Sequence, residues 1–170
     1  VRLASIQVDA IVTSTRRRTR ETAAIVQSQW ERPPADVWED SRLNELAFGG
    51  LEGLTWNEGQ ARYPEAASAW LSGTPGAAFP GGESLLDLSN RTSAFLRNLK
   101  DDRREGTVVV VAHGGSLRHI IGHLLGLDAR HSWRIELAPC SLSRATIVDG
   151  AATFGLLNDT CHLEMARRER

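Results

Sequence analysis

A histidine stands at the end of the most apolar segment of the chain. Val108–Val111 and Ala112 run directly into His113, and Gly114 and Gly115 follow before an apolar helical pattern begins. This order places an imidazole at the carboxyl end of a strand and beside a helix N-terminus, where backbone N–H groups and the helix dipole attract anions. Because glycine lets the backbone approach a ligand closely, we expect His113 and Gly114 to bind a phosphate group.

A second junction between a strand pattern and a helix pattern carries a run of arginines. Ser14 follows the apolar segment 10–13, and Arg18 lies in the first turn of the helical pattern after it. Ser14 or Thr15 could cap this helix. An arginine fork matches phosphate geometry, and the ends of neighbouring strands converge in an open α/β sheet. An arginine in the first turn of this helical pattern could therefore reach the same site as His113, while Arg16, Arg17 and Arg20 are interpreted as a solvated surface.

A glycine-rich loop over 41–53 supplies a carboxylate. Glu45 lies in this loop, and a glutamate beside a phosphate site could serve as a general acid. The second acidic residue of the loop, Glu52, is interpreted as a surface carboxylate. The sequence thus offers an arginine, a glutamate and a histidine on three separate segments.

The elements that must position these residues alternate between strand and helix patterns. Ser84 and Asp87 resemble a helix N-cap with its acidic partner, and Asp149-Gly150 is a turn signal between two late strands. An interruption is expected at Tyr63-Pro64. The predicted strands are 10–13, 37–38, 107–112, 135–137, 142–148 and 153–157, and the predicted helices are 17–30, 56–71, 84–99 and 116–125. This rhythm predicts an α/β fold with a mostly parallel sheet flanked by helices, as one domain over residues 1–170.

Composition excludes several classes of protein. The chain has 170 residues, 41% of them hydrophobic, and a formal net charge of −1, which suits a globular domain with its own core. Cys140 and Cys161 lack the spacing of a zinc pair, a redox motif or a disulfide framework. The clearest apolar run is too short to span a bilayer and no signal-peptide pattern opens the chain, so we expect no membrane partner and a cytoplasmic location.

Two further histidines have the i, i+4 spacing of a metal-binding helix. His119 and His123 are separated by Ile120-Ile121-Gly122, which lacks the glutamate of a zinc-protease helix. The predictions are therefore no metal and no cofactor.

Together these segments, in this order, resemble the histidine phosphatase superfamily, which includes cofactor-dependent phosphoglycerate mutases and many small phosphatases. Thr13–Ala23 is similar to the family segment Ser-Ser-x-x-x-Arg-Ala-x-x-Thr-Ala, with Thr19 in place of the usual alanine. Leu43–Gly53 is similar to Leu-x-Glu-x-x-x-Gly-x-x-Glu-Gly, and the segment around His113 to Ser/Ala-His-Gly-Gly. The segments 80–84 and 157–163 also look like family segments, the latter like those of α-ribazole phosphatases.

The resemblance implies roles for these residues. Arg18 and His113 would bind the phosphoryl oxygens, and Glu45 would protonate the leaving alkoxide and later activate water. Ser14, Glu83 and Ser84 are the candidate substrate contacts. The implied reaction is hydrolysis of a small phosphate ester through a phosphohistidine, with a small phosphorylated metabolite as substrate and no metal.

The chain departs from the family in one respect. The Arg-His-Gly motif, whose histidine is the nucleophile, occurs nowhere in it. By the family pattern this motif would lie upstream of Val1, on a strand, loop and helix of roughly 35 residues. We therefore expect the domain to be N-terminally incomplete, to lack its first strand and to be inactive by itself. The isolated chain should aggregate or need a partner, and the sequence leaves its oligomeric state open.

Three alternatives remain at this point. A phosphoglycerate mutase-like phosphotransferase would share the first chemical step, but mutases carry longer insertions around the site than residues 53–82 provide. A non-catalytic domain could bind a phosphorylated ligand through Arg18 and His113 alone. The chain could also be the C-terminal phosphatase part of a bifunctional protein with an upstream ribonuclease H-like domain, which is the one case in which we expect nucleic acid as a partner.

Overall fold

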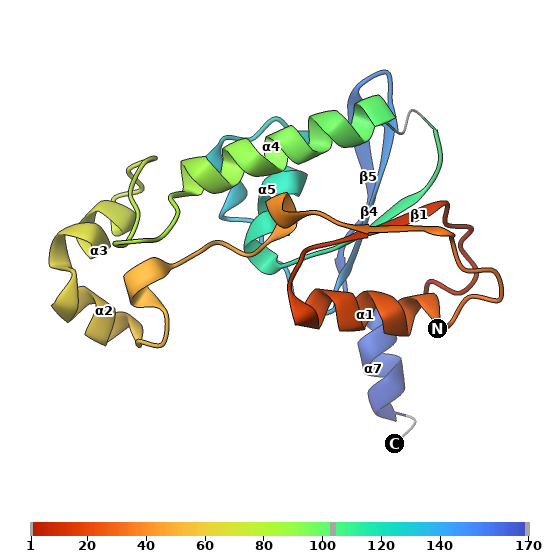
Figure 1. Ribbon diagram of the computed structural model, residues 1–170, viewed down its shortest axis with the longest axis horizontal. Coiled ribbons are helices and arrows are strands. Elements are labelled where there is room, and N and C mark those ends of the chain that lie inside the picture. Colours follow the sequence, from red (N-terminus) through yellow and green to blue (C-terminus); the bar gives the residue numbers. More distant parts are fainter. Residues whose placement is uncertain (1, 103–104, 169–170) are drawn as a thin grey trace.

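The computed structural model describes residues 2–102 and 105–168, and it has a parallel three-stranded sheet at its centre (Figure 1). The strands are β1 (Ala10–Thr13), β2 (Asp36–Glu39) and β3 (Val108–Val111), in the order β2-β1-β3. Ala10 of β1 is in register with Asp36 on one side and Val108 on the other. This agrees with the predicted α/β class and with a mostly parallel sheet.

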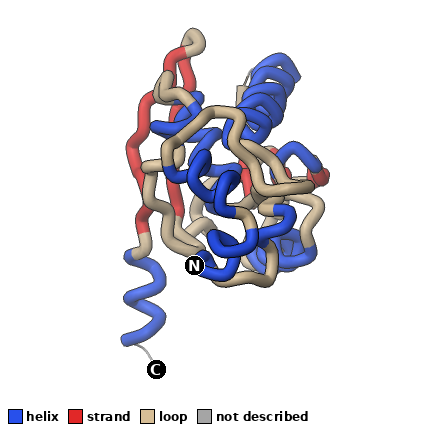
Figure 2. Tube along the Cα trace, turned by 90° about the vertical axis from the view of Figure 1, so that its left-hand side faces the viewer, coloured by secondary structure: helices blue, strands red, loops and turns tan. Residues whose placement is uncertain are grey.

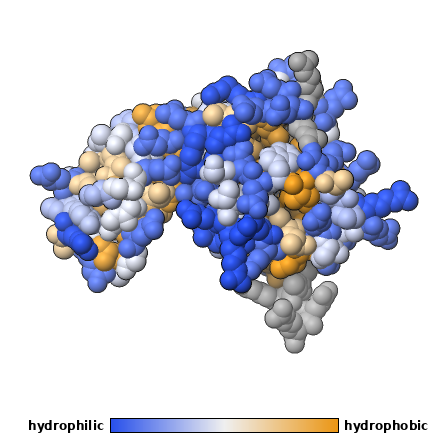
Figure 3. All heavy atoms as spheres, in the orientation of Figure 1, coloured by the Kyte–Doolittle hydropathy of each residue, from blue (hydrophilic) through white to orange (hydrophobic). Residues whose placement is uncertain are grey.

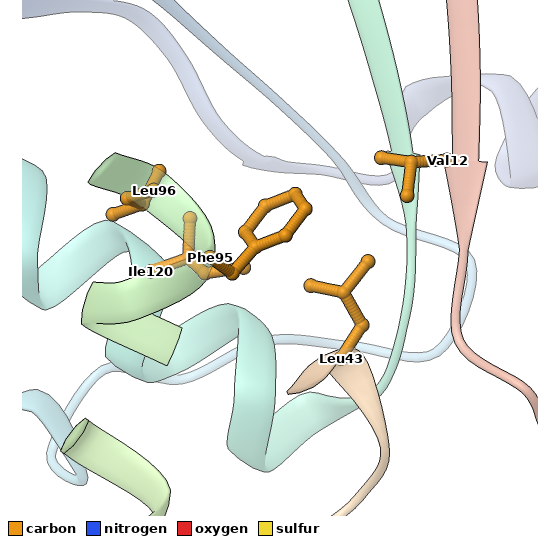
Figure 4. Close-up of a cluster of buried hydrophobic side chains, with 5 residues drawn as sticks. All are labelled: Val12, Leu43, Phe95, Leu96 and Ile120. Carbon is orange, nitrogen blue, oxygen red and sulfur yellow. The ribbon is translucent and has the colours of Figure 1, made fainter. Parts of the chain in front are cut away.

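Helices cover both faces of this sheet because successive residues of a strand point to opposite sides. Val12 packs with Leu43 and with Phe95, Leu96 and Ile120, which come from α4 (Leu85–Asp102) and α5 (Gly114–Leu124) (Figure 4). On the opposite face, Ile11 packs with Val8, Trp30 and Ala23 of α1 (Arg17–Gln27). The sheet therefore lies between two helical layers.

The four valines of β3 are less buried than the residues of β1. Every residue of β1 is fully buried, whereas each valine of β3 is only half-buried. Within the described residues β3 pairs with β1 alone, so its second edge forms no ladder. The valines of β3 are therefore only half-buried, because an edge strand stays accessible to solvent.

A separate antiparallel hairpin follows the core. It consists of β4 (Leu142–Val148) and β5 (Ala151–Asp159), which pair only with each other in the described part of the chain. Asp149 and Gly150 both have positive φ, as the predicted two-residue turn requires. Figure 2 shows the hairpin at one side of the molecule, with α7 (Cys161–Arg168) extending away from its end.

The lobe that follows the Glu45 loop contains the short helices α2 (Trp56–Arg62) and α3 (Pro64–Leu71). The break at Tyr63-Pro64 is confirmed, since Pro64 occupies the first turn of α3. Phe79 contacts the rings of Trp56, Tyr63 and Trp70 at centroid distances of 6.1–6.2 Å. The molecular outline is indented between this lobe and the body that carries α1 (Figure 3).

Some predicted boundaries are wrong. Residues 135–137 form no strand, because the chain turns there directly after α6 (Ala129–Ser132), with Ile135 N–H donating to the Ser132 carbonyl. Helix α1 ends at Gln27 rather than Trp30, whose indole N–H instead donates to the Leu3 carbonyl. The 41–53 loop contains two single 3₁₀ turns, η1 (Ser41–Leu43) and η2 (Gly49–Leu51). Among the described residues, every helix is too short or too polar to cross a bilayer.

Candidate active site

The three predicted chemical groups meet at one edge of the parallel sheet. β1 leads into α1 and Arg18, β2 leads through η1 to Glu45, and β3 leads into His113. Because the strands are parallel and adjacent, their carboxyl ends open on the same side (Figure 1). The sheet thus brings together Arg18 and His113, which lie 95 positions apart in sequence.

His113 is the centre of this group. It is 6% exposed and occupies the N-cap position of α5. Its Nε2 lies 2.7 Å from Ser14 Oγ, and its Nδ1 accepts a hydrogen bond from Arg18 Nε at 3.1 Å. Burial lowers the pKa of His113, and the positive charge of Arg18 lowers it further, against the opposing effect of Glu45. The ring is therefore neutral at pH 7 in this state.

Arg18 lies on the first turn of α1 with its side chain exposed. Its Nε contacts His113, while within the described part of the chain its two terminal NH₂ groups form no hydrogen bond or ion pair. Such a guanidinium can receive an anion at the sheet edge.

Glu45 is fixed against the start of α5. Its Oε1 accepts hydrogen bonds from Gly115 N–H at 2.9 Å and from Leu46 N–H at 3.0 Å, and its Oε2 lies 3.3 Å from the same Gly115 nitrogen. A Cβ on residue 115 would lie 2.3 Å from Glu45 Oε1 and 3.3 Å from the Trp133 ring. Glycine is therefore required at position 115 for the carboxylate to sit here, and Oε2 remains the freer oxygen for exchanging a proton.

The three candidate substrate contacts have protein partners. Ser14 is fully buried behind His113. Glu83 forms an ion pair with Arg91, with 2.8 Å between Arg91 Nε and Oε1, and accepts from Ala47 N–H at 3.0 Å. Ser84 caps α4, since its Oγ donates to Asp87 Oδ2 and accepts from Asp87 N–H. The cap predicted from Ser84 and Asp87 is confirmed.

The cap predicted for α1 is wrong. Its N-cap residue is Arg16, which makes no side-chain cap bond, rather than Ser14 or Thr15. Ser14 Oγ accepts from Arg16 N–H at 3.2 Å, and Thr15 instead donates from both N and Oγ1 to Asn44 Oδ1. The Ser14 hydroxyl is directed to His113, so it does not serve the helix end as predicted.

Two residues that sequence reasoning missed support the site. Arg91 donates to the backbone carbonyls of Arg42 and Glu45, at 2.6 Å and 3.2 Å, while holding Glu83, and so clamps the loop that carries Glu45. Thr19 is 3% exposed and lies 2.7 Å from Ser14 Oγ. The replacement of the family's alanine by Thr19 was the available signal for the second residue, whereas nothing in the helical pattern around Arg91 distinguishes it.

His119 and His123 face different surroundings. His119 is fully buried beside Trp133, and neither ring nitrogen has a hydrogen-bond partner among residues 2–102 and 105–168. Burial lowers the pKa of His119 to about 4. His123 Nε2 lies 2.8 Å from the Ser89 carbonyl. Among the residues that the structure describes, no three His, Cys, Asp or Glu side chains gather as a metal site would require.

The site lies on the carboxyl edge of a parallel sheet, at a helix N-terminus. It contains a neutral histidine, a carboxylate bonded to the helix N-terminus, and a guanidinium whose terminal NH₂ groups form no bond within the described part of the chain. These features define an α/β enzyme that acts on phosphate groups. The family model of the histidine phosphatase superfamily (branch 1) matches residues 1–160. The chain therefore belongs to this superfamily, as a phosphatase. The resemblance inferred from its motifs is confirmed.

Among curated relatives, phosphoserine phosphatase 1 of Hydrogenobacter thermophilus is 31% identical over 156 residues, which cover 92% of this chain and 72% of the relative. A Photorhabdus laumondii protein named "Probable phosphoglycerate mutase GpmB" is 34% identical over 143 residues, covering 84% of this chain and 65% of that protein. The chain thus spans about two thirds to three quarters of the length of these relatives.

Solved structures agree on the fold. YhfR of Bacillus stearothermophilus superposes with a TM-score of 0.83 at 26% identity, covering 95% of this chain and 79% of YhfR. The α-ribazole phosphatase of Shigella flexneri gives a TM-score of 0.81 at 26% identity, covering 91% and 75%. Both similarities extend over nearly the whole of this chain.

Proposed function

We propose that the protein hydrolyses a small phosphate monoester through a phosphohistidine intermediate, whose nucleophilic histidine lies upstream of Val1. The observation that carries this proposal is the convergence of Arg18, Glu45 and His113 at one sheet edge. The substrate class is a small phosphorylated metabolite, as the names of the phosphoserine and α-ribazole phosphatase relatives suggest.

Each residue has a defined task in this reaction. The upstream histidine nitrogen attacks phosphorus, and the bond between phosphorus and the ester oxygen breaks. Arg18 and His113 bind the phosphoryl oxygens during this step, and Glu45 gives a proton to the leaving alkoxide. Water then attacks the phosphohistidine, Glu45 takes its proton, and the phosphorus–nitrogen bond breaks to release phosphate. Glu45 ends as it began, protonated, with its Oε2 the oxygen that exchanges the proton.

The open edge of β3 supports an upstream strand. Val108–Val111 are half-buried on a strand that ends two residues before His113. A further strand that paired in parallel with this edge would place its own carboxyl end beside His113 and Arg18. A nucleophile carried there would face the phosphate that these two residues bind.

Phosphoglycerate mutase chemistry is the second candidate, because the Photorhabdus relative carries that name. In a mutase the phosphohistidine passes its phosphoryl group to a second hydroxyl instead of water. A non-catalytic phosphate-binding domain and the phosphatase part of a protein with an upstream ribonuclease H-like domain are the remaining proposals.

The test is hydrolysis of p-nitrophenyl phosphate by this chain and by a version extended to its native start. We expect activity in the extended chain only. Activity in the short chain that His113→Ala abolishes would make His113 the nucleophile and overturn the proposal. Absence of activity in both, with phosphate binding retained, would favour the binding domain, and transfer between two phosphoglycerate hydroxyls would favour the mutase.

A further inference from the structure

A buried chain of hydroxyl groups lies behind His113, on the side away from Arg18. His113 Nε2 is 2.7 Å from Ser14 Oγ, and Ser14 Oγ is 2.7 Å from Thr19 Oγ1. Thr19 Oγ1 in turn lies 2.7 Å from the Arg16 carbonyl and 3.1 Å from the Ser14 carbonyl. Ser14 is fully buried, and Thr19 and His113 are 3% and 6% exposed, so these groups must satisfy one another.

The hydrogen bonds of this chain have one consistent direction. A guanidinium can only donate, so the bond from Arg18 Nε requires a lone pair on His113 Nδ1. A neutral ring with a lone pair on Nδ1 carries its proton on Nε2, which therefore donates to Ser14 Oγ.

Ser14 Oγ then has no free lone pair to offer. It accepts from His113 Nε2 and also from Arg16 N–H at 3.2 Å, so its own proton must go to another acceptor. Thr19 Oγ1 is that acceptor, and it passes its own proton to the Arg16 carbonyl. With alanine at position 19, the Ser14 proton would lose this acceptor and would be satisfied best by donating to Nε2, which shifts the ring towards the tautomer that is protonated on Nδ1.

We propose that Thr19, acting through Ser14, is a positioning residue that keeps His113 protonated on Nε2 and so reserves Nδ1 as the nitrogen that meets the ligand. Both hydroxyls are buried on the Nε2 side of the ring, away from Arg18. Thr19 stands at the position of the alanine in the family segment Ser-Ser-x-x-x-Arg-Ala-x-x-Thr-Ala.

Binding of a phosphate would use the reserved nitrogen; this step rests on the proposed function. Arg18 turns its donors to the phosphoryl oxygens, and Nδ1 takes up a proton from the phosphate monoanion or from solvent. The ring then donates from both nitrogens, Nδ1 to a phosphoryl oxygen and Nε2 to Ser14 as before. The hydroxyl chain needs no rearrangement, so the ring keeps its orientation between the two states.

The test is the tautomer of His113, read from its ring nitrogen shifts in the histidine-¹⁵N-labelled protein extended to its native start and assigned with His113→Gln. In the wild type without ligand we expect the proton on Nε2. Thr19→Val keeps the side-chain volume but removes the hydroxyl, and should lower the ratio of Nε2–H to Nδ1–H about fivefold, the equivalent of one buried hydrogen bond. Arg18→Met removes the donor to Nδ1 and brings the ratio of the two tautomers closer to one. In that background the same roughly fivefold change gives the largest difference in the two populations.

Matched variants separate the hydroxyl from its surroundings. Thr19→Ser keeps the hydroxyl and should restore the wild-type ratio, and Thr22→Val, which removes an exposed hydroxyl one turn along α1, should leave it unchanged. Thr19→Ala replaces Thr19→Val if the latter does not fold. A wild-type ring protonated on Nδ1, or a ratio that Thr19→Val and Thr19→Ala leave unchanged, would overturn the proposal.

Inorganic phosphate distinguishes this inference from the function on which its last step rests. We expect phosphate to protonate Nδ1 while Nε2 stays protonated. If the free ring carries its proton on Nε2 and phosphate changes nothing, the phosphate site is wrong and the role of Thr19 stands.

Discussion

At the scale of single residues, the site combines the hydrogen-bonded carboxylate of Glu45 with two groups that can bind an anion, Arg18 and His113. The Oε1 atom of Glu45 is occupied by two backbone N–H groups, which fixes the carboxylate plane against α5. Arg18 and His113 contact each other at 3.1 Å, an arrangement that a bound phosphate would have to open. The roles assigned to these residues remain predictions that substitutions can test.

Glu45→Gln removes the proton donor while keeping the shape and the contact with Gly115 N–H. In the complete protein we expect kcat for an alkyl phosphate to fall by about 10²- to 10⁴-fold, because the alkoxide leaves unprotonated. The measurement compares an alkyl phosphate with p-nitrophenyl phosphate, whose phenolate needs less protonation and should lose less. An equal loss on both substrates would assign Glu45 a role other than general acid.

Gly115→Ala tests the position of that carboxylate. The added Cβ would lie 2.3 Å from Glu45 Oε1, so the carboxylate must move, and we expect kcat to fall by about 10- to 100-fold. Gly76→Ala is the matched control, since no atom lies within 4 Å of its added Cβ. Steady-state kinetics of both variants would check this, and an active Gly115→Ala enzyme would mean that Glu45 has room to shift without loss.

At the scale of elements, the loop that carries Glu45 depends on α4. Arg91 reaches from α4 to two carbonyls of that loop and to Glu83, which also bonds to Ala47 N–H. Hydrogen bonds with a charged group contribute more than neutral ones when they are partly buried. The loop conformation is therefore set by a helix that lies some 46 residues further along the chain.

Arg91→Met should destabilise the fold by about 2 kcal/mol and lower activity, because the Glu45 loop loses its clamp and Glu83 loses its partner. Urea unfolding at pH 7 measures the first effect and kcat the second. Arg17→Met is the control: its pair with Glu21 is exposed, and such pairs contribute about 0.5 kcal/mol or less. Equal losses of stability in the two variants would contradict the clamp.

His119, which lies on α5, makes the stability of the fold sensitive to acid. Its pKa is held at about 4, below the ordinary value of 6.5, because the buried ring cannot be charged without loss of solvation. Between pH 4 and pH 6.5 the unfolded state therefore binds more protons than the folded state. The folded state keeps its full stability with respect to His119 above pH 6.5 and loses stability as the pH falls towards 4. The full loss in the free energy of unfolding is about 3 kcal/mol.

His119→Leu should remove this acid sensitivity. We expect urea midpoints of the variant to fall less than those of the wild type between pH 7 and pH 4.5. The difference between the two proteins isolates His119 from His113, whose pKa is also lowered and which titrates in the same direction. Parallel acid profiles would show that His119 is not the group responsible.

At the scale of the whole molecule, the parallel sheet and the hairpin are separate sheets in this chain. β3 leaves one edge without a ladder among the described residues, and β4 and β5 pair only with each other. An apolar strand edge without a ladder can pair with another chain, which is the basis of the expectation that this chain aggregates or needs a partner.

Hydrogen exchange can test the proposed upstream strand. Those amides of Val108–Val111 that do not donate to β1 should exchange at least about tenfold more slowly in the extended protein than in this chain, because a new ladder would protect them. The β1 amides serve as an internal reference. Unchanged exchange at β3 would place the upstream segment elsewhere, and a monomeric chain that melts cooperatively would argue against the incomplete sheet.

Much of the fold and site could be predicted from local patterns. Strands 10–13 and 142–148, the break at Tyr63-Pro64, the cap formed by Ser84 and Asp87, and the turn at Asp149-Gly150 depend on neighbours within a few residues. The same holds for the placement of Arg18, Glu45 and His113, each of which follows a strand. The strand predicted at 135–137 failed because a short apolar pattern forms a strand only where a partner strand exists.

The sequence by itself determined which chemical groups the site contains, since each is fixed by its place next to a strand end or a helix start. Only the tertiary structure decided what those groups contact: Ser14 stands behind His113 rather than in front of it, Thr19 completes its hydrogen bonds, and Arg91 holds the Glu45 loop. These contacts join segments up to 99 residues apart, and they arise from the strand order β2-β1-β3, which no local pattern specifies.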